Sequence, residues 1–114
     1  MISLRLQIRL GVDTRIGHGK IQLLEEIDRT GSISAAARAV GMNYRRGWDL
    51  IDQMNRAFES PLVTGTTGGL GGAALTQLGR DIVAHYRAME EKVSQAATSD
   101  LQAIEELLER ARKA

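Results

Sequence analysis

The stretch SISAAARAVGMNYRRGWDLIDQMNRAF, residues 32–58, decides the fold of this chain. Its first part, 35–40, is a short alanine-rich segment that ends at Gly41. Its second part, 43–58, carries apolar residues at helical spacing. A glycine between two helical segments supplies the positive φ that a tight turn needs. The pattern therefore predicts a helix-turn-helix pair.

Polar residues stand where these two helices should begin. Ser32 is the expected N-cap of the first helix, with Ser34 as the alternative, because a serine oxygen accepts from a free amide there. Asn43 is the expected N-cap of the second helix. Val40 and Trp48 are the apolar residues expected to fill the space between the helices, so Trp48 is predicted to lie in the core.

Upstream of the pair, residues 2–10 alternate apolar and polar side chains, which predicts one strand with a buried face. Residues 11–19 are interpreted as a polar connection. A helix is then expected from about Gly19 to Thr30, and Gly31 should end it by adopting a left-handed backbone.

Downstream of the pair, residues 60–79 carry no charged side chain at all. A short strand is expected at 62–64 and a return strand at 73–76, joined by a stretch with five glycines between 65 and 72. This arrangement is typical of a β-hairpin with a long tip.

Two more helices are expected at the C-terminal end. Thr76 should cap a helix that runs to about Ala97, and the S-x-x-Q pattern of 99–102 reads as a capping box that starts another. Together the two helices carry more apolar residues than a small domain needs. We expect them to form a dimer surface, the alternative being that they fold back onto their own core.

The expected fold is therefore mainly α with a small β-sheet: a winged helix-turn-helix with an N-terminal strand, a β-hairpin wing and C-terminal dimerisation helices. The expected division is a DNA-binding domain over 1–97 and a helical extension over 98–114. The length of 114 residues suits one core.

Charge indicates which ligand this fold should bind. The formal net charge is only +1, but no acidic residue lies between Asp28 and Asp49, whereas four arginines do. A locally basic segment suits an anion such as double-stranded DNA, the alternative being a solvated helix face. Side chains expected to contact DNA lie on the helix pair, on the wing and at the start of the next helix. These are Ser34, Arg38, Asn43, Tyr44, Arg45, Arg46, Thr64, Thr66, Thr67 and Arg80.

Different roles are expected within this set. Arginine offers a fork to guanine and asparagine one to adenine, and both also reach phosphates. For Arg45 and Arg46 the choice between base and phosphate stays open. Arg38 and Arg80 are expected at phosphates.

The run TGSISAAARAVGMNYRRGWDLI, residues 30–51, resembles the N-terminal DNA-binding domain of the ModE molybdate-responsive regulators. So does GGLGGAALT at 68–76, followed by Leu78 and Gly79. The likeness covers roughly residues 20–95. The broader LysR-type winged helix shares the alanine pair and the Leu-Thr start of the last helix, but not the Tyr-Arg-Arg-Gly-Trp run.

The resemblance implies a dimeric transcription factor that binds a pseudo-palindromic operator. The chain has no room after this domain for the molybdate-binding region of such regulators, so direct molybdate sensing is not expected. The alternatives are that a partner protein supplies a sensor or that the protein acts through its own abundance. Leu70 also stands where a basic wing residue is expected, which shifts the expected affinity to the helix.

Other functions find little support in the sequence. There is no cysteine, His18 and His85 lack neighbouring ligands, and the glycines lack the Gly-Lys-Ser/Thr of a phosphate loop. We therefore expect no enzyme, no metal, no cofactor and no membrane span, and a cytoplasmic location. The alternative function is a winged-helix protein-interaction module that does not bind DNA.

Overall fold

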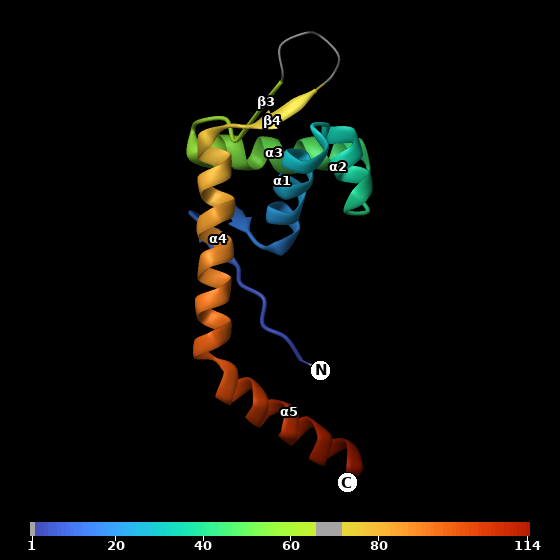
Figure 1. The fold of residues 1–114 in the computed structure, drawn as a ribbon, viewed down its shortest axis with the longest axis vertical. Helices are drawn as coiled ribbons and strands as arrows, with labels where there is room; N and C mark the ends of the chain where they lie inside the picture. Colours follow the sequence, from blue (N-terminus) through green and yellow to red (C-terminus); the bar gives the residue numbers. More distant parts are fainter. Residues whose placement is uncertain (1, 66–71) are drawn as a thin grey trace.

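The computed structural model describes residues 2–65 and 72–114. A head formed by the first three helices and four short strands sits at one end of a long helix, α4, and α5 continues beyond it (Figure 1). The molecule measures 61 × 25 × 25 Å. The elements are β1 (Ile8–Leu10), β2 (Thr14–Ile16), α1 (His18–Thr30), α2 (Ile33–Ala39), α3 (Tyr44–Phe58), β3 (Val63–Gly65), β4 (Ala73–Leu75), α4 (Gln77–Ala96) and α5 (Thr98–Lys113).

The N-terminal segment forms a small hairpin instead of one long strand. β1 pairs antiparallel with β2, with Ile8 opposite Ile16, across a turn in which Gly11 has a φ of 68°. The strand predicted over 2–10 is therefore present only over Ile8–Leu10, and the prediction that 11–19 is only a polar connection was wrong, because β2 and the start of α1 lie there. Tertiary packing explains the difference. Ile16 is only 2% exposed, and its burial in the core stabilises the strand that carries it.

The helix-turn-helix pair and its caps are confirmed. The Ser32 side chain accepts a hydrogen bond from the Ala35 amide at 3.1 Å, and that of Asn43 accepts one from the Arg46 amide at 2.8 Å. Gly41 takes the positive φ that the turn requires, at 79°. Each cap satisfies an amide that the first turn of a helix leaves free.

Trp48 lies outside the core, so its predicted burial was wrong. Its side chain is 43% exposed, because its neighbour Gly47 takes the place that faces α2. A Cβ on Gly47 would lie 3.2 Å from the Ala37 Cβ, so α2 and α3 approach too closely for a large residue between them. Val40 does pack against the core. The centre of the core is made of fully buried side chains, including Ile21, Leu23, Leu24, Ile27, Ile51, Met54 and Leu62.

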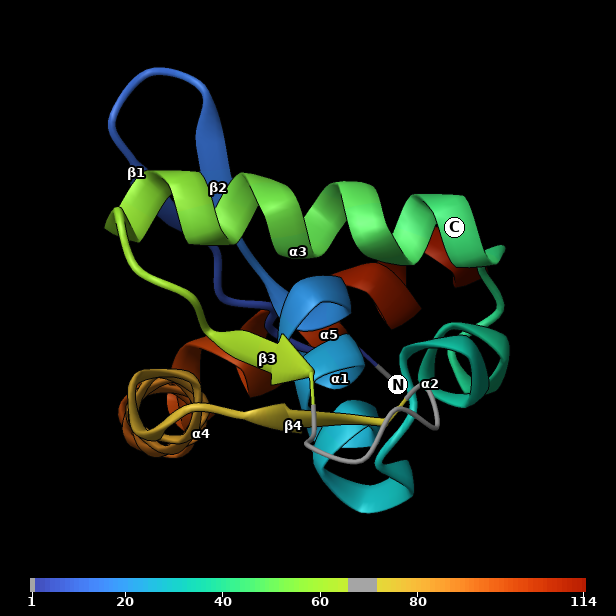
Figure 2. The ribbon, with the colours of Figure 1, turned by 90° about the horizontal axis from the view of Figure 1, so that it is seen from above.

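The hairpin is confirmed in its described part. β3 pairs antiparallel with β4, with Thr64 opposite Ala74. The Ala73 amide donates to the Gly31 carbonyl at 2.9 Å, which ties the wing to the start of the helix pair. The wing strands and α3 lie at the same end of the molecule (Figure 1), and the view from above shows α1 and α4 end-on (Figure 2).

The two C-terminal helices differ in their packing. Thr76 caps α4 by accepting from the Gly79 amide at 3.1 Å, as predicted. α5 begins at Thr98, and no side chain caps it, so the capping box expected at 99–102 does not form. No residue of α5 is buried, and α5 extends away from the head. The alternative that these two helices fold back onto the core of their own chain is therefore correct for α4, which buries Tyr86 in the core, and wrong for α5. No described helix is long and apolar enough to cross a membrane.

Arg87 joins α4 to α1. Its guanidinium donates to both carboxylate oxygens of Glu25, at 2.6 and 2.9 Å, and to Glu90 at 2.7 Å. These hydrogen bonds from Arg87 lower the pKa of the Glu25 carboxyl. The hydroxyl of the preceding residue, Tyr86, donates to the Leu6 carbonyl at 2.6 Å and holds the N-terminal segment beside α4.

We expect Arg87→Met to lower the free energy of unfolding by about 1 kcal/mol at neutral pH, since solvent screens a pair that is a third exposed. Because the folded pKa of Glu25 is depressed, the pair stabilises above the ordinary glutamate pKa and is lost as pH falls through the folded value. The difference between variant and parent should therefore shrink below roughly pH 4. Urea unfolding followed by circular dichroism at several pH values measures it.

Arg29→Met is the matched control, because Arg29 pairs with Glu26 within one helix and its side chain is 66% exposed. An equal loss from both substitutions, or a loss from Arg87→Met that does not depend on pH, would contradict this account.

Candidate nucleic-acid interface

The exposed surface of α3 has three parts. Successive residues of a helix are separated by roughly 100°, and the side facing the core is fixed by the buried residues Gly47, Leu50, Ile51 and Met54. Tyr44 and Trp48 then lie on the flank beside the wing, and Arg45 lies on the outer side. The opposite flank faces the β1–β2 hairpin and holds Arg46, Gln53 and Ala57, of which the last two line a hollow with residues 10–14.

Arg45 and Arg46, which were predicted together, therefore point in different directions. Both are exposed. The Arg46 charge lies close enough to Lys20 to lower the pKa of that amine, although burial of Lys20 is the larger cause. Lys20 in turn donates to the Arg15 carbonyl at 2.6 Å. Arg46 is thus part of a basic cluster next to α1, whereas Arg45 occupies the outermost side of α3.

A hollow of about 310 Å³ lies between α2, α3 and the wing. Ile33, Val63 and Ala73 form its apolar floor, and each is buried. Tyr44 and Trp48 form one wall, with their rings edge to face and their centroids 6.3 Å apart. Tyr44 was predicted to contact DNA, whereas Trp48 was not. Gly47 was the available sequence signal for an exposed Trp48. A glycine at the helix contact indicates that α2 and α3 lie too close for an indole between them.

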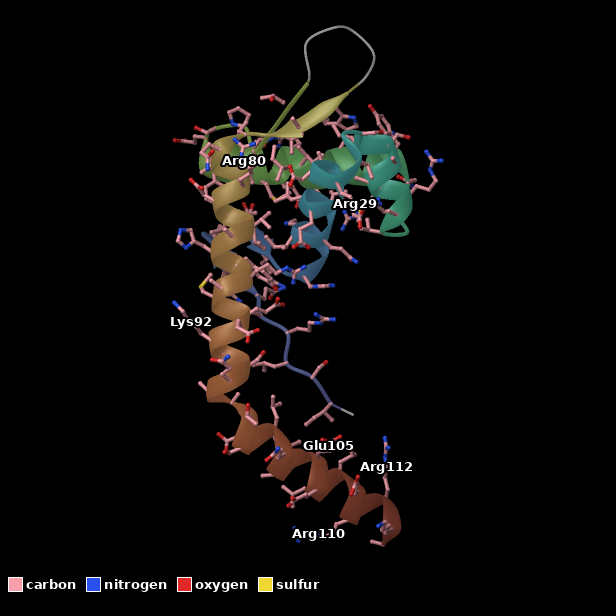
Figure 3. All side chains as sticks on the ribbon, viewed as in Figure 1. Arg29, Arg80, Lys92, Glu105, Arg110 and Arg112 are labelled. Atoms are coloured by element: carbon pink, nitrogen blue, oxygen red, sulfur yellow. The ribbon has the colours of Figure 1, made fainter. Side chains whose placement is uncertain are left out.

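Four more predicted residues lie around this hollow or at the same end of the molecule. Ser34 and Thr64 line the hollow and are exposed, and Arg38 is exposed on α2. Arg80 lies at the wing end of α4 (Figure 3), where it donates to the Leu75 carbonyl at 2.9 Å and to the Gln77 side chain. Its guanidinium is therefore held in place beside the wing.

The remaining predicted residues have other positions or roles. Asn43 uses its side-chain oxygen as the cap of α3, which leaves its amide nitrogen for a ligand. Thr66 and Thr67, and Leu70 with them, fall outside the described residues.

Carboxylates, to which the sequence pattern assigned no role, are also present on the outer side of α3. Asp52 forms an ion pair with Arg56 one turn later, and Asp49 is exposed one turn after Arg45. The i,i+4 spacing of Asp52 and Arg56 was the available signal. Because this pair neutralises itself, the free positive charge on α3 lies towards its N-terminal end. Within the part of the chain that the structure describes, no group of three or more metal-ligating side chains comes together.

Comparison with known proteins agrees with this arrangement. Residues 18–80, which run from the start of α1 to the first turn of α4, match the family model for the bacterial regulatory helix-turn-helix protein of the lysR family. The chain belongs to this family.

Curated relatives of this lysR-family chain include several ModE proteins. It is 38% identical to the molybdenum transport protein ModE of Azotobacter vinelandii, over 95% of this chain and 46% of that protein. It is 45% identical to the molybdenum-pterin-binding protein MopB of Rhodobacter capsulatus, over 75% of this chain and 32% of that protein. The DNA-binding transcriptional dual regulator ModE of Escherichia coli K12 is 40% identical over the same shares. The predicted resemblance to the N-terminal domain of ModE-type regulators is confirmed. The chain spans less than half the length of these relatives.

Solved structures of lysR-family proteins share the fold. The CbnR_DBD–DNA complex aligns over 75% of this chain and 94% of that chain with a TM-score of 0.60 and 14% identity. VV2_1132, a LysR family transcriptional regulator, aligns over 74% of this chain and 28% of that chain with a TM-score of 0.57 and 20% identity. The predicted winged helix-turn-helix fold is therefore confirmed.

Proposed function

We propose that this chain is the DNA-binding part of a ModE-type transcriptional regulator that recognises a specific sequence in double-stranded DNA. The observation that carries the proposal is the N-terminal half of α3. It carries Arg45 and the free amide of Asn43 on a helix that lies at the same end of the molecule as the wing, in a segment free of acidic residues from 29 to 48. An exposed helix of this kind, capped and basic at its start, fits the major groove.

The surrounding residues suit contacts to the phosphate backbone. With α3 in the major groove, α2 and the start of α4 flank it on two sides, and their arginines Arg38 and Arg80 are both exposed. The hydroxyls of Ser34 and Thr64 line the hollow between α3 and the wing and suit hydrogen bonds to sugar or phosphate. Thr66 and Thr67, which lie outside the described residues, stay predicted DNA contacts. Such contacts fix orientation, while α3 supplies the sequence preference.

We further propose that two copies bind together, through α4 and α5. Beyond the head, these helices expose Met89, Val93, Ile104, Leu107 and Leu108, each by between 36% and 56%. On α5 the three apolar side chains recur at i, i+3 and i+4, which places them on one side of the helix. A second copy that covers this side would present two α3 helices to a pseudo-palindromic operator. Such a regulator acts in the cytoplasm of a bacterium, with a partner protein supplying any effector site that this part lacks.

Arg45→Ala should weaken binding to the preferred duplex by about 1–3 kcal/mol and relax the preference at one base position. Arg46→Ala should reduce the binding free energy by a smaller amount and should weaken binding to all duplexes alike, because the Arg46 side chain lies on the flank away from the wing. Arg110→Ala removes the same charge from α5, at the far end of the molecule (Figure 3), and should change little. Fluorescence anisotropy with preferred and scrambled duplexes measures all three.

The experiment that tests the function compares the duplex upstream of the chain's own gene with a scrambled duplex. Both are titrated at two salt concentrations, with and without molybdate. Tighter binding to the upstream duplex, weakening steeply with salt, is expected. A failure to bind either duplex at low salt would overturn the proposal and favour the protein-interaction module.

A further inference from the structure

We propose that the hollow between α3 and the wing receives the C5-methyl group of a thymine, which Trp48 and Tyr44 contact in the major groove. This inference rests on the proposed DNA binding and names what one part of that surface reads. The hollow has a volume of about 310 Å³. Ile33, Val63 and Ala73 form its floor, and the two aromatic rings form one wall.

The first observation is where the chain places its aromatic side chains. It has only four, namely Trp48, Tyr44, Tyr86 and Phe58. Tyr86 is 1% exposed and Phe58 packs against the core, but Trp48 is 43% exposed and Tyr44 53%. Half of the aromatic residues therefore stand next to each other in solvent, on one flank of one helix. Large exposed apolar groups that touch each other indicate a contact surface.

The second observation is the chemistry of the hollow. Its floor is apolar, Ser34 and Thr64 line it with hydroxyl groups, and no charged side chain lines it among the described residues. A phosphate would therefore find no charged partner inside, whereas Arg38 and Arg45 offer charge around it. We therefore expect the hollow to bind a small apolar group that belongs to a polyanion. The arginines outside the hollow would bind the anionic part.

The third observation is the position of the hollow relative to Arg45. Trp48 lies one turn after Tyr44 on the same flank, and Arg45 is the residue next to Tyr44 on the outer side. If α3 enters the major groove so that Arg45 reaches base edges, the aromatic wall faces the same groove. The C5-methyl of thymine is the apolar group that base pairs present there. Its burial against two rings would distinguish thymine from cytosine at that position.

The test begins with a duplex selected from a random pool by the protein itself. Each thymine in that duplex is replaced in turn by uracil, which lacks only the methyl group. Replacement at one position in each half-site is expected to weaken binding about fourfold, the effect of leaving one methyl unburied. Replacement by 5-bromouracil, whose bromine fills the place of the methyl, should restore the affinity.

Variants connect that position to the hollow. In Trp48→Ala, and separately in Tyr44→Ala, the preference for thymine over uracil should disappear while the duplex is still bound. Gln53→Ala, on the opposite flank of α3, should keep the full preference. Because Trp48 is the only tryptophan, its own fluorescence should also change when the selected duplex binds the parent protein.

The outcomes separate this inference from the proposed function. A duplex that binds tightly but tolerates uracil at every thymine would overturn the inference and leave DNA binding intact. A thymine preference that survives in both aromatic variants would overturn it as well. Recovery of no preferred duplex from the pool would instead count against the proposed function itself.

Discussion

Gly79→Ala is expected to destabilise the protein by about 3 kcal/mol, although it adds a single methyl group. Gly79 lies in the first turn of α4, where the helix passes over the strand that enters the wing. A Cβ there would overlap the Leu62 carbonyl oxygen and would lie 3.3 Å from the Leu62 carbonyl carbon and 3.4 Å from the Leu75 Cβ. The Leu62 oxygen cannot move freely, because it accepts a hydrogen bond from the Thr76 amide at 2.9 Å.

Gly19→Ala is the matched control for this prediction. Gly19 also lies in the first turn of a helix, but a Cβ there would meet nothing within 4 Å. Alanine favours the helical backbone over glycine, so this variant should gain about 0.5–1 kcal/mol. Urea unfolding followed by far-ultraviolet circular dichroism compares the two. If the two substitutions shifted the midpoint equally, the close approach of α4 to Leu62 would not be what requires glycine at 79.

Leu107→Asp should convert the proposed dimer into monomers at micromolar concentration. Leu107 is 56% exposed on α5, so the fold of the single chain should not change. A carboxylate at that place would have to be desolvated in a dimer without a partner, which disfavours association. Binding to a two-half-site operator should then weaken roughly 100-fold, because the two α3 helices no longer act as one bivalent ligand.

Gln102→Asp adds the same charge to the other side of α5 and should leave both the mass and the affinity unchanged. Light scattering gives the mass, and anisotropy with an operator and with an isolated half-site gives the affinity. A parent protein that is monomeric at these concentrations would contradict the dimer. An intact dimer of Leu107→Asp would place the interface elsewhere.

The local features of the helix-turn-helix followed from the sequence alone. Ser32 and Asn43 were recognised as caps because their side chains satisfy amides within three residues, which needs no distant partner. Gly41 was recognised because its positive φ is a property of its own backbone. The basic segment was visible as well, since charge can be counted along the chain.

Tertiary structure decided the direction in which each side chain of the candidate site points. Trp48 shares a helical stripe with Ile51 and Met54, so its period alone favours the core. The close approach of Ala37 to Gly47 rotates the buried side of α3 and leaves the indole in solvent beside the wing. The same rotation places Arg45 on the outer side of α3 and Arg46 on the flank away from the wing, a difference that the sequence does not predict.

Tertiary structure also decided the elements at both ends of the chain. Thr14–Ile16 forms a strand that pairs with β1 and buries Ile16 in the core. The sequence does not predict this strand, because the charged residues Asp13 and Arg15 favour an exposed connection. α5 starts at Thr98 without its predicted cap and packs on no core. The sequence by itself thus determined the caps, the turn and the charge, because these depend on neighbours along the chain. Only the tertiary structure determined the exposed aromatic wall and the free side of α5, because burial depends on residues far away in sequence.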